Sequence, residues 1–243
     1  MISFLISAIK IIFLLGFLIG IHETGHFLIA KLCKVRVNEF AIGFGPVIWK
    51  KQGKETKYEL RLIPLGGFVN MEGEAEQSEK EGSFTKASIP RRIAIVAAGA
   101  LVNIIFAIIV YFILAMTIRG NLTNAVVGNR VLDADNFGNR VYFASYNTKE
   151  FMLSIAESVK QLFTGKVSSA ELVGPVGISE VVAKTNGFRE FIYILSAISI
   201  SLGVTNLLPF PPLDGGKIVL ILLEAIRRKP LNEKTEINIQ LIG

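Results

Sequence analysis

His22 and His26 lie four residues apart in the run His22-Glu23-Thr24-Gly25-His26, which has the pattern H-E-x-x-H. On an α-helix, side chains at positions i and i+4 share one face, so the two imidazoles can chelate one Zn²⁺. Glu23 follows the first histidine and can reach a metal-bound water as a general base. The chain contains no other histidine. The pattern therefore predicts one zinc ion per chain and hydrolytic chemistry.

The surroundings of this motif argue against a chance match, although a bare H-E-x-x-H does occur by accident in helix-rich sequences. The motif lies near the end of an apolar run, residues 2–32, in which Lys10 is the only charged residue before His22. Burying two imidazoles and a carboxylate in a segment that crosses lipid is costly unless they serve a purpose. We therefore interpret the motif as functional.

A third metal ligand must come from elsewhere in the chain, because catalytic zinc usually takes three protein ligands and leaves one position for water. With no third histidine, that ligand is an aspartate, a glutamate or a cysteine. Asp214 is the best candidate, since it ends the third apolar segment at the depth expected for His22 and His26. It could instead serve as a helix N-cap. The other acidic candidates lie in polar segments: Asp133, Asp135, Glu39, Glu59 and Glu72.

Composition places this chemistry in a membrane. The 243 residues are 51% hydrophobic and 19% charged, with a mean hydropathy of +0.51. These values exclude a disordered chain, and the single cysteine excludes a disulfide scaffold. Three segments are long enough to cross a bilayer: residues 2–32, 93–118 and 191–213. The sequence therefore predicts a mainly α-helical integral membrane protein with at least three transmembrane helices.

Loop charges predict the orientation. The segment from Lys31 to Arg92 carries twelve Lys and Arg residues, so the positive-inside rule places it in the cytoplasm and the N-terminus outside. Residues 119–189 then lie outside, and the cluster at 227–229 returns to the cytoplasm. The H-E-x-x-H motif falls near the cytoplasmic side. The net charge of +6 is attributed to these loops facing lipid headgroups, so we expect a bilayer and no nucleic acid as partner.

Smaller patterns add detail. Residues 44–51 and 57–63 read as strands joined by a turn at residues 52–56, which predicts a β-hairpin in the cytoplasmic loop. Gly16 and Gly20 form a G-x-x-x-G pattern that favours close helix packing within or between chains, and so allows a homo-oligomer. Cys33 could approach the metal, but a buried structural thiol is the stronger interpretation.

The third apolar segment is interrupted by Pro209, Pro211 and Pro212. Proline cannot continue a helix, and unpaired backbone groups at membrane depth are tolerated only beside protein or a water-filled cavity. A hydrolytic site needs such a cavity, because water is its second substrate. Asn206 places an amide in the same region, where it could bond a neighbouring helix or hold a substrate backbone.

Several runs that together cover most of the chain resemble the site-2 protease family of intramembrane zinc metalloproteases, in particular the bacterial regulator-of-sigma-E type. The runs are His22–His26, Gly43–Pro46, Ile63–Gly73, Phe84–Arg92, Ala97–Asn103, Gly174–Ile178 and Asn206–Gly216. The resemblance implies a multi-pass protein of the bacterial cytoplasmic membrane. It also implies a small membrane-associated β-structure in the cytoplasmic loop, which pairs with an unwound substrate strand.

The resemblance also implies roles for individual residues. Zinc would be held by His22, His26 and Asp214, with Glu23 as the base. Substrate would be contacted by residues of the β-structure and of the third span: Tyr58, Leu60, Gly66, Gly67, Phe68 and Asn206.

Two departures from the family pattern shape the expected domains. Members usually carry PDZ domains between the second and third spans, but residues 121–150 are too few for one. Members also usually have a fourth span, whereas this chain stops at Gly243. We expect a first part, 1–118, with two spans and a β-loop at about 34–90, an outer segment, 119–186, and a last part, 187–243, with the third span and a cytoplasmic tail.

The expected activity is hydrolysis of peptide bonds in or near transmembrane segments of single-span membrane proteins. Anti-sigma factors and remnant signal peptides are the substrates that the resemblance suggests. An alternative is a catalytically silent membrane-binding or adaptor protein on the same scaffold, against which the intact Glu23 argues. A metal transporter would require more acidic or histidine residues in its spans.

Overall fold

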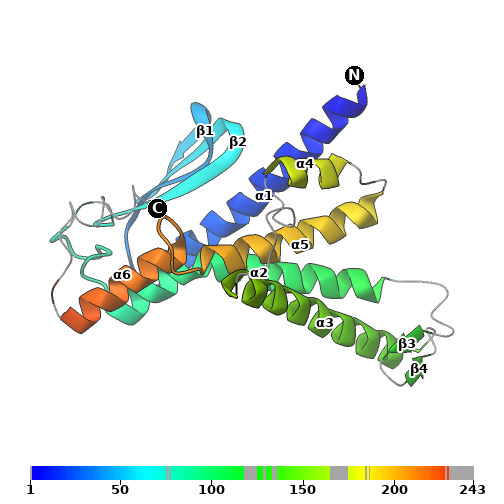
Figure 1. Cartoon of the computed structure of the whole chain (residues 1–243). Coiled ribbons are helices and arrows are strands. Elements are labelled where there is room, and N and C mark those ends of the chain that lie inside the picture. The colour runs from blue at the N-terminus through cyan, green and yellow to red at the C-terminus, as the bar shows by residue number, and fades with distance from the viewer. Residues whose placement is uncertain are drawn as a thin grey trace. The chain divides into compact units, whose positions relative to one another are not determined.

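The computed structural model describes residues 2–74, 76, 78–117, 125–127, 130–132, 136–164, 175–183, 185, 187–227 and 229. The elements, labelled in Figure 1, are α1 (Ile2–Leu32), β1 (Val37–Gln52), β2 (Lys57–Met71), α2 (Ile89–Met116), β3 (Ala125–Val127), β4 (Arg130–Leu132), α3 (Phe137–Phe163), α4 (Pro175–Ala183), α5 (Phe188–Asn206) and α6 (Asp214–Arg227). They form two compact units: a first unit of residues 1–8 with 105–201, and a second unit of residues 9–104 with 202–243.

Among the described residues, three helices are long and apolar enough to cross a membrane: Leu5–Leu32, Ile89–Met116 and Phe188–Asn206. The predicted class, a mainly helical membrane protein with a small β-structure, is confirmed. The third helix ends at Asn206, shortly before the prolines that interrupt the third apolar segment. The prolines that follow explain this end, because a helix cannot extend through them.

The second unit contains the core that positions the chemistry. Buried side chains from the end of α1, the sheet, the start of α2 and α6 form one cluster: Ala30, Val35, Val37, Met71, Phe84, Ile95, Val96 and Ile221. The helices α1 and α2 cross closely at Gly25, where a Cβ atom would lie 2.6 Å from the carbonyl oxygen of Ala98. Cys33, which is half-buried, packs beside this cluster.

The predicted hairpin is present, with the turn closed by the Gly53 N–H donating to the Thr56 carbonyl. Its two strands bend back on themselves, so they make more pairings than the strands of a simple hairpin. Residues 37–42 pair with residues 67–71 on one side and with residues 57–60 on the other, and residues 57–61 pair in turn with residues 47–52. Two bent strands therefore make four rows. Residues 67–71 form an outer row that has no second strand partner in the part of the chain that is described.

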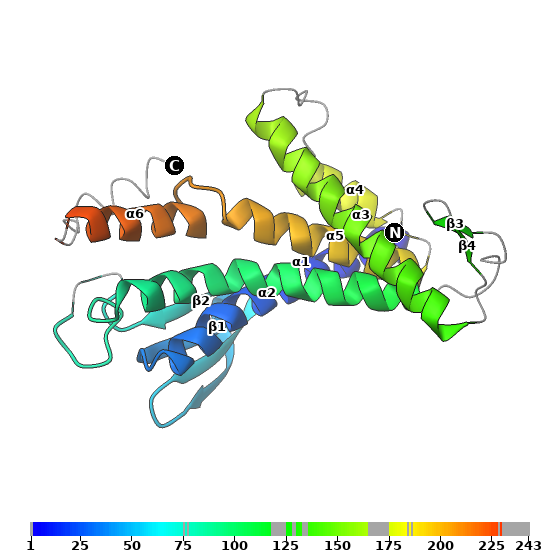
Figure 2. The same ribbon diagram turned by 90° about the horizontal axis from the view of Figure 1, so that it is seen from below.

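The bends occur at glycines. Gly43 and Gly66 have φ angles of 91° and 109°, which favour a residue without a Cβ atom. At Gly66 the ring of Phe44 also lies where a Cβ would be placed, with 1.9 Å between them. The sheet lies beside α1 in both Figure 1 and Figure 2.

Gly16 and Gly20 accommodate this sheet. A Cβ at Gly16 would lie 2.3 Å from the carbonyl oxygen of Pro64, and one at Gly20 would lie 3.8 Å from Ile42. The G-x-x-x-G pattern, read from the sequence as a helix-packing motif, lies in this structure where α1 contacts β2 at Pro64 and β1 at Ile42.

The first unit contains α3, a helix of 27 residues. Its residue Phe151 stacks on Tyr111 with 4.4 Å between ring centroids, and Tyr193 adds a third ring. Asp133, Asp135 and residues 230–243 lie outside the described residues, so the expectations that concern them stay predictions.

One ion pair joins α2 to α6 in the second unit. The Arg92 guanidinium bonds the Glu224 carboxylate at 2.6 Å, and both side chains are largely buried. Removing one partner of a buried pair leaves an uncompensated charge, whereas replacing both by apolar groups is often tolerated.

We expect Glu224→Ala to destabilise the protein by roughly 3 kcal/mol, because Arg92 would stay buried without its counter-charge. The double variant Arg92→Met with Glu224→Leu should recover most of that loss. Thermal unfolding in detergent micelles measures both changes. A double variant no more stable than Glu224→Ala would contradict this account of the pair.

Candidate metal centre

His22 and His26 occupy one face of α1, one turn apart, as the sequence predicts. Their ring centroids are 4.8 Å apart and their Nε2 atoms are 3.1 Å apart. The apolar run of α1 keeps this segment helical, and Thr24, whose hydroxyl donates to the Gly20 carbonyl, satisfies its own polar atom within the helix. Both rings are therefore held toward the same point.

Asp214 completes the group from the opposite end of the sequence. Its Oδ2 atom lies 3.2 Å from His22 Nε2 and 3.5 Å from His26 Nε2. Asp214 is the first residue of α6, and the chain before it folds back over the first turn of that helix. A Cβ at Gly215 would lie 2.2 Å from the carbonyl oxygen of Leu207, so only glycine fits there. The glycines after Asp214 thus let it approach the histidines.

The protonation of His26 follows from its neighbour. Its Nδ1 atom lies 2.9 Å from the Ile95 carbonyl oxygen, which can only accept, so Nδ1 carries the proton. Nε2 faces Asp214, and in the neutral ring it holds a lone pair directed there. A backbone carbonyl on the far nitrogen is the usual arrangement around a metal-binding histidine.

The three atoms fit one tetrahedral zinc ion. A zinc–ligand distance of about 2.0–2.1 Å sets ligand atoms about 3.3 Å apart, close to the 3.1, 3.2 and 3.5 Å observed. Asp214 Oδ2 is buried and receives no hydrogen bond in the described part of the chain. When unprotonated, these atoms repel one another at such distances, and a shared cation removes the repulsion. The donor set and spacing therefore suit the metal.

Glycine on α2 keeps the space in front of the histidines open. A Cβ at Gly99 would lie 2.4 Å from His26 Nε2 and 2.8 Å from His22 Nε2. No spacing rule marks Gly99 in the sequence. A glycine within an apolar helix, facing another at Gly25, is the signal that could have indicated it.

A cavity of about 230 Å³ opens beside the three ligand candidates. Glu23 lines it, with its Cγ atom 3.0 Å from where a Cβ at Gly67 would lie, so the carboxylate stands between α1 and the outer row of the sheet. Phe68 also lines the cavity, as do Glu74 and Lys217, which form an ion pair with each other. The sequence analysis did not single out this pair.

The remaining sequence candidates are placed differently. Tyr58 pairs with Phe40 on one side and Lys51 on the other, and Leu60 pairs with Ile42 and Trp49. Neither has a free strand edge, and neither lines the cavity. Gly66 forms the bend before the outer row, and Asn206 ends α5; both also lie outside the set of cavity-lining residues. Of the expected substrate contacts, the structure brings Gly67 and Phe68 to the cavity.

The description of peptidase family M50 matches residues 10–243. The chain belongs to peptidase family M50. A zinc metalloprotease of Fusobacterium nucleatum is 32% identical over 316 residues, covering 96% of this chain and 91% of that protein. One of Clostridium acetobutylicum is 30% identical, covering 90% and 87%. The regulator of sigma-E protease RseP of Escherichia coli is 43% identical over 118 residues, covering 46% of this chain and 26% of RseP.

The M50 enzyme described here is thus a zinc metalloprotease of the site-2 protease type, with apolar helices suited to a bilayer. The alignment with the Fusobacterium relative spans 316 residues, more than the 243 residues of this chain. That relative therefore carries polypeptide within the aligned region that this chain lacks. The division into domains at residues 118 and 186 stays a prediction.

We expect Gly99→Ala to bind zinc at least about tenfold more weakly, because the added methyl group intrudes on both Nε2 atoms. Gly20→Ala is the matched control, since its Cβ meets only ordinary contact distances. Zinc titration against a competing chelator, on purified protein, measures the affinity. Equal zinc affinities in the two variants would show that Gly99 does not shape a metal site.

Proposed function

We propose that this M50 enzyme hydrolyses peptide bonds in or near transmembrane segments of single-span membrane proteins, with one zinc ion per chain held by His22, His26 and Asp214. The observation that carries the proposal is the convergence of the two Nε2 atoms and Oδ2, the three separated by 3.1–3.5 Å although Asp214 follows His26 by 188 residues. Packing alone gives no reason for three metal-ligating side chains to meet at one point.

The proposed chemistry assigns the proton transfers to Glu23. Zinc, when bound, supplies a Lewis acid that polarises a carbonyl and lowers the pKa of water. Glu23 accepts the proton of the attacking water and later donates it to the nitrogen of the leaving amine, as the C–N bond breaks. Glu23 extends from α1 toward Gly67, which keeps its carboxylate in the cavity where a peptide bond would enter.

The outer row of the sheet supplies a means of presenting the substrate. A helix conceals its peptide bonds in internal hydrogen bonds, so a transmembrane substrate must unwind before cleavage. Residues 67–71 form a strand edge that has no second partner among the described residues, and all of them except Asn70 line the cavity. An unwound segment can add to that edge through main-chain hydrogen bonds. Its scissile bond would then lie beside Glu23.

The distribution of Lys and Arg supports a topology for this enzyme in the bacterial inner membrane. We propose that the loop containing the sheet faces the cytoplasm, together with the nearby H-E-x-x-H motif, and that α3 and the N-terminus lie on the opposite side. The twelve basic residues between Lys31 and Arg92 are the basis of this assignment.

We expect Glu23→Gln to abolish cleavage, with a loss of at least about a hundredfold, because glutamine cannot accept the proton of water. The assay uses purified enzyme in phospholipid vesicles with a panel of single-span reporter proteins. Glu55→Gln is the matched control, since Glu55 pairs with Lys31 away from the cavity and should leave the rate unchanged. Full activity in Glu23→Gln would reject the mechanism. A wild-type enzyme that contains zinc and binds but cleaves none of the reporters would favour a silent binding protein.

We expect a single cysteine in the turn between β1 and β2 and a single cysteine in α3 to react from opposite sides of the membrane. In a Cys33→Ala background, Lys54→Cys should react with a membrane-impermeant maleimide only from the cytoplasmic side, and Lys149→Cys only from the outer side. Both positions are exposed. Labelling of the two positions from the same side would overturn the proposed topology.

A further inference from the structure

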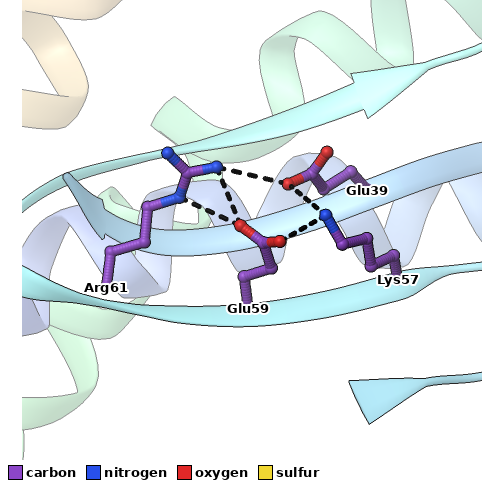
Figure 3. Close-up of polar contacts among 4 residues, drawn as sticks. All are labelled: Glu39, Lys57, Glu59 and Arg61. Carbon is purple, nitrogen blue, oxygen red and sulfur yellow. Dashed lines mark hydrogen bonds and ion pairs between the residues drawn. The ribbon is translucent and has the colours of Figure 1, made fainter. Parts of the chain in front are cut away.

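Four charged side chains form a closed network on the sheet: Glu39, Lys57, Glu59 and Arg61, shown in Figure 3. Glu59 lies between the two cations, with Lys57 bonded to one carboxylate oxygen and Arg61 to the other. The guanidinium donates to Glu59 through Nε at 3.1 Å and through Nη2 at 2.8 Å, and Nη2 also reaches Glu39 at 3.4 Å. The network thus contains two carboxylates and two cations.

The Glu59 carboxylate is the fixed point of this network. Its side chain is only 2% exposed, so each oxygen needs a partner. Hydrogen bonds from Lys57, and then from Arg61, hold the pKa of Glu59 below its ordinary value, which keeps the carboxylate charged. Two bonds to one carboxylate oxygen fix the plane of the Arg61 guanidinium as well as its position.

Arg61 connects the network to the catalytic cavity. The centre of its guanidinium lies 5.2 Å from the centroid of the Phe68 ring, and Phe68 lines the cavity. Glu59, Ala41 and Phe68 stand opposite one another in adjacent rows, so their side chains share a face of the sheet. The small Ala41 leaves the space between Glu59 and Phe68 open, and Arg61 spans it.

The pairing of a substrate strand with the outer row determines which substrate side chains would contact Phe68. Side chains of an added strand alternate between the two faces, so only every second substrate residue shares the face of Phe68. On the other face, Val69 and Phe40 stand opposite each other, and the Phe40 ring lies 5.0 Å from Phe27 of α1. A substrate side chain on the face of Phe68 would pack against its ring as a cross-strand neighbour.

We propose that Arg61, held by Glu59 and Glu39, positions the ring of Phe68 as a wall that selects a large apolar side chain at one position of the substrate strand. This inference rests on the proposed function, since it assumes that the substrate adds to the outer row. The network is balanced in charge and its groups bond one another, so it offers an acidic or basic substrate side chain no counter-charge. The ring, backed by the guanidinium plane, offers apolar contact area.

The test measures selectivity rather than activity alone. Wild-type enzyme is assayed on a single-span reporter in which each of two adjacent residues near the cleaved bond is changed in turn to Phe, Leu, Ala or Asp. Because side chains alternate, we expect kcat/KM to favour Phe over Ala by up to about fivefold at one of the two positions and little at the other. Phe68→Ala should abolish the preference.

The decisive variants are Arg61→Lys and Arg61→Met. Lysine keeps the charge but has neither the planar fork nor the stacking surface, so both variants should reduce the Phe-to-Ala ratio toward one. Lys57→Met is the matched control: Lys57 bonds the same Glu59, yet the structure gives it no contact with Phe68, so the ratio should be retained. Thermal unfolding of each variant identifies any variant that is misfolded. If Arg61→Met is misfolded, the milder Arg61→Lys substitution still provides the test.

Two outcomes would overturn the proposal. One is an unchanged ratio in folded Arg61→Lys, and the other is an equal loss of the ratio in Lys57→Met, which would indicate a purely structural network. Failure of the proposed function looks different, because wild-type enzyme would then cleave no reporter, or Glu23→Gln would cleave as well as wild type.

Discussion

The convergence of three potential metal-ligand atoms in a largely buried setting is the constraint around which this structure is organised. His26 Nδ1 donates to the Ile95 carbonyl, so Nε2 faces Asp214 Oδ2 at 3.5 Å and His22 Nε2 at 3.1 Å. When all three atoms are unprotonated they repel one another without a cation, and burial strengthens the repulsion by excluding water. The surrounding packing must hold it in place. Glycines allow the chain segments around the site to pack closely. Gly25 and Gly99 lie between α1 and α2, and Gly215 lies beneath the chain that precedes α6.

The helix α1 serves the site and the sheet at once. Its histidines face the start of α2, while Gly16 and Gly20 accept Pro64 and Ile42 of the sheet. The outer row of the sheet thereby comes to lie against Glu23, so the proposed base and the strand edge share one cavity. A substrate that pairs with the edge, as we propose, would be positioned by the same contact that holds the sheet. The packing of a single helix would then couple binding to chemistry.

Sequence reasoning succeeded where side-chain chemistry or hydrophobic length decides the outcome. The spans follow from runs of apolar residues, and Asp214 follows from the lack of a third histidine together with its depth. It fell short where backbone geometry decides. The four-row pairing depends on positive φ angles at Gly43 and Gly66, and no periodicity reveals it, so Tyr58 and Leu60 were expected at an edge but lie in inner rows. Helix packing and packing against a sheet make the same demand on Gly16 and Gly20, namely the absence of a side chain. The sequence pattern therefore does not distinguish the two contacts.

The charged network illustrates how ionised side chains can support a surface that binds apolar groups. Charges close to lipid are costly singly, but a pair of carboxylates matched by two cations carries no net charge, and each group satisfies the other's hydrogen bonds. A guanidinium fixed in this way is more rigid than any aliphatic side chain of its length, since bonds at one end hold it in a plane. It can therefore support the ring of Phe68 from one side. A leucine at position 61 would leave the Glu59 Oε2 atom without its partner, although Lys57 would still bond Oε1, so the support and the neutrality depend on the same residue.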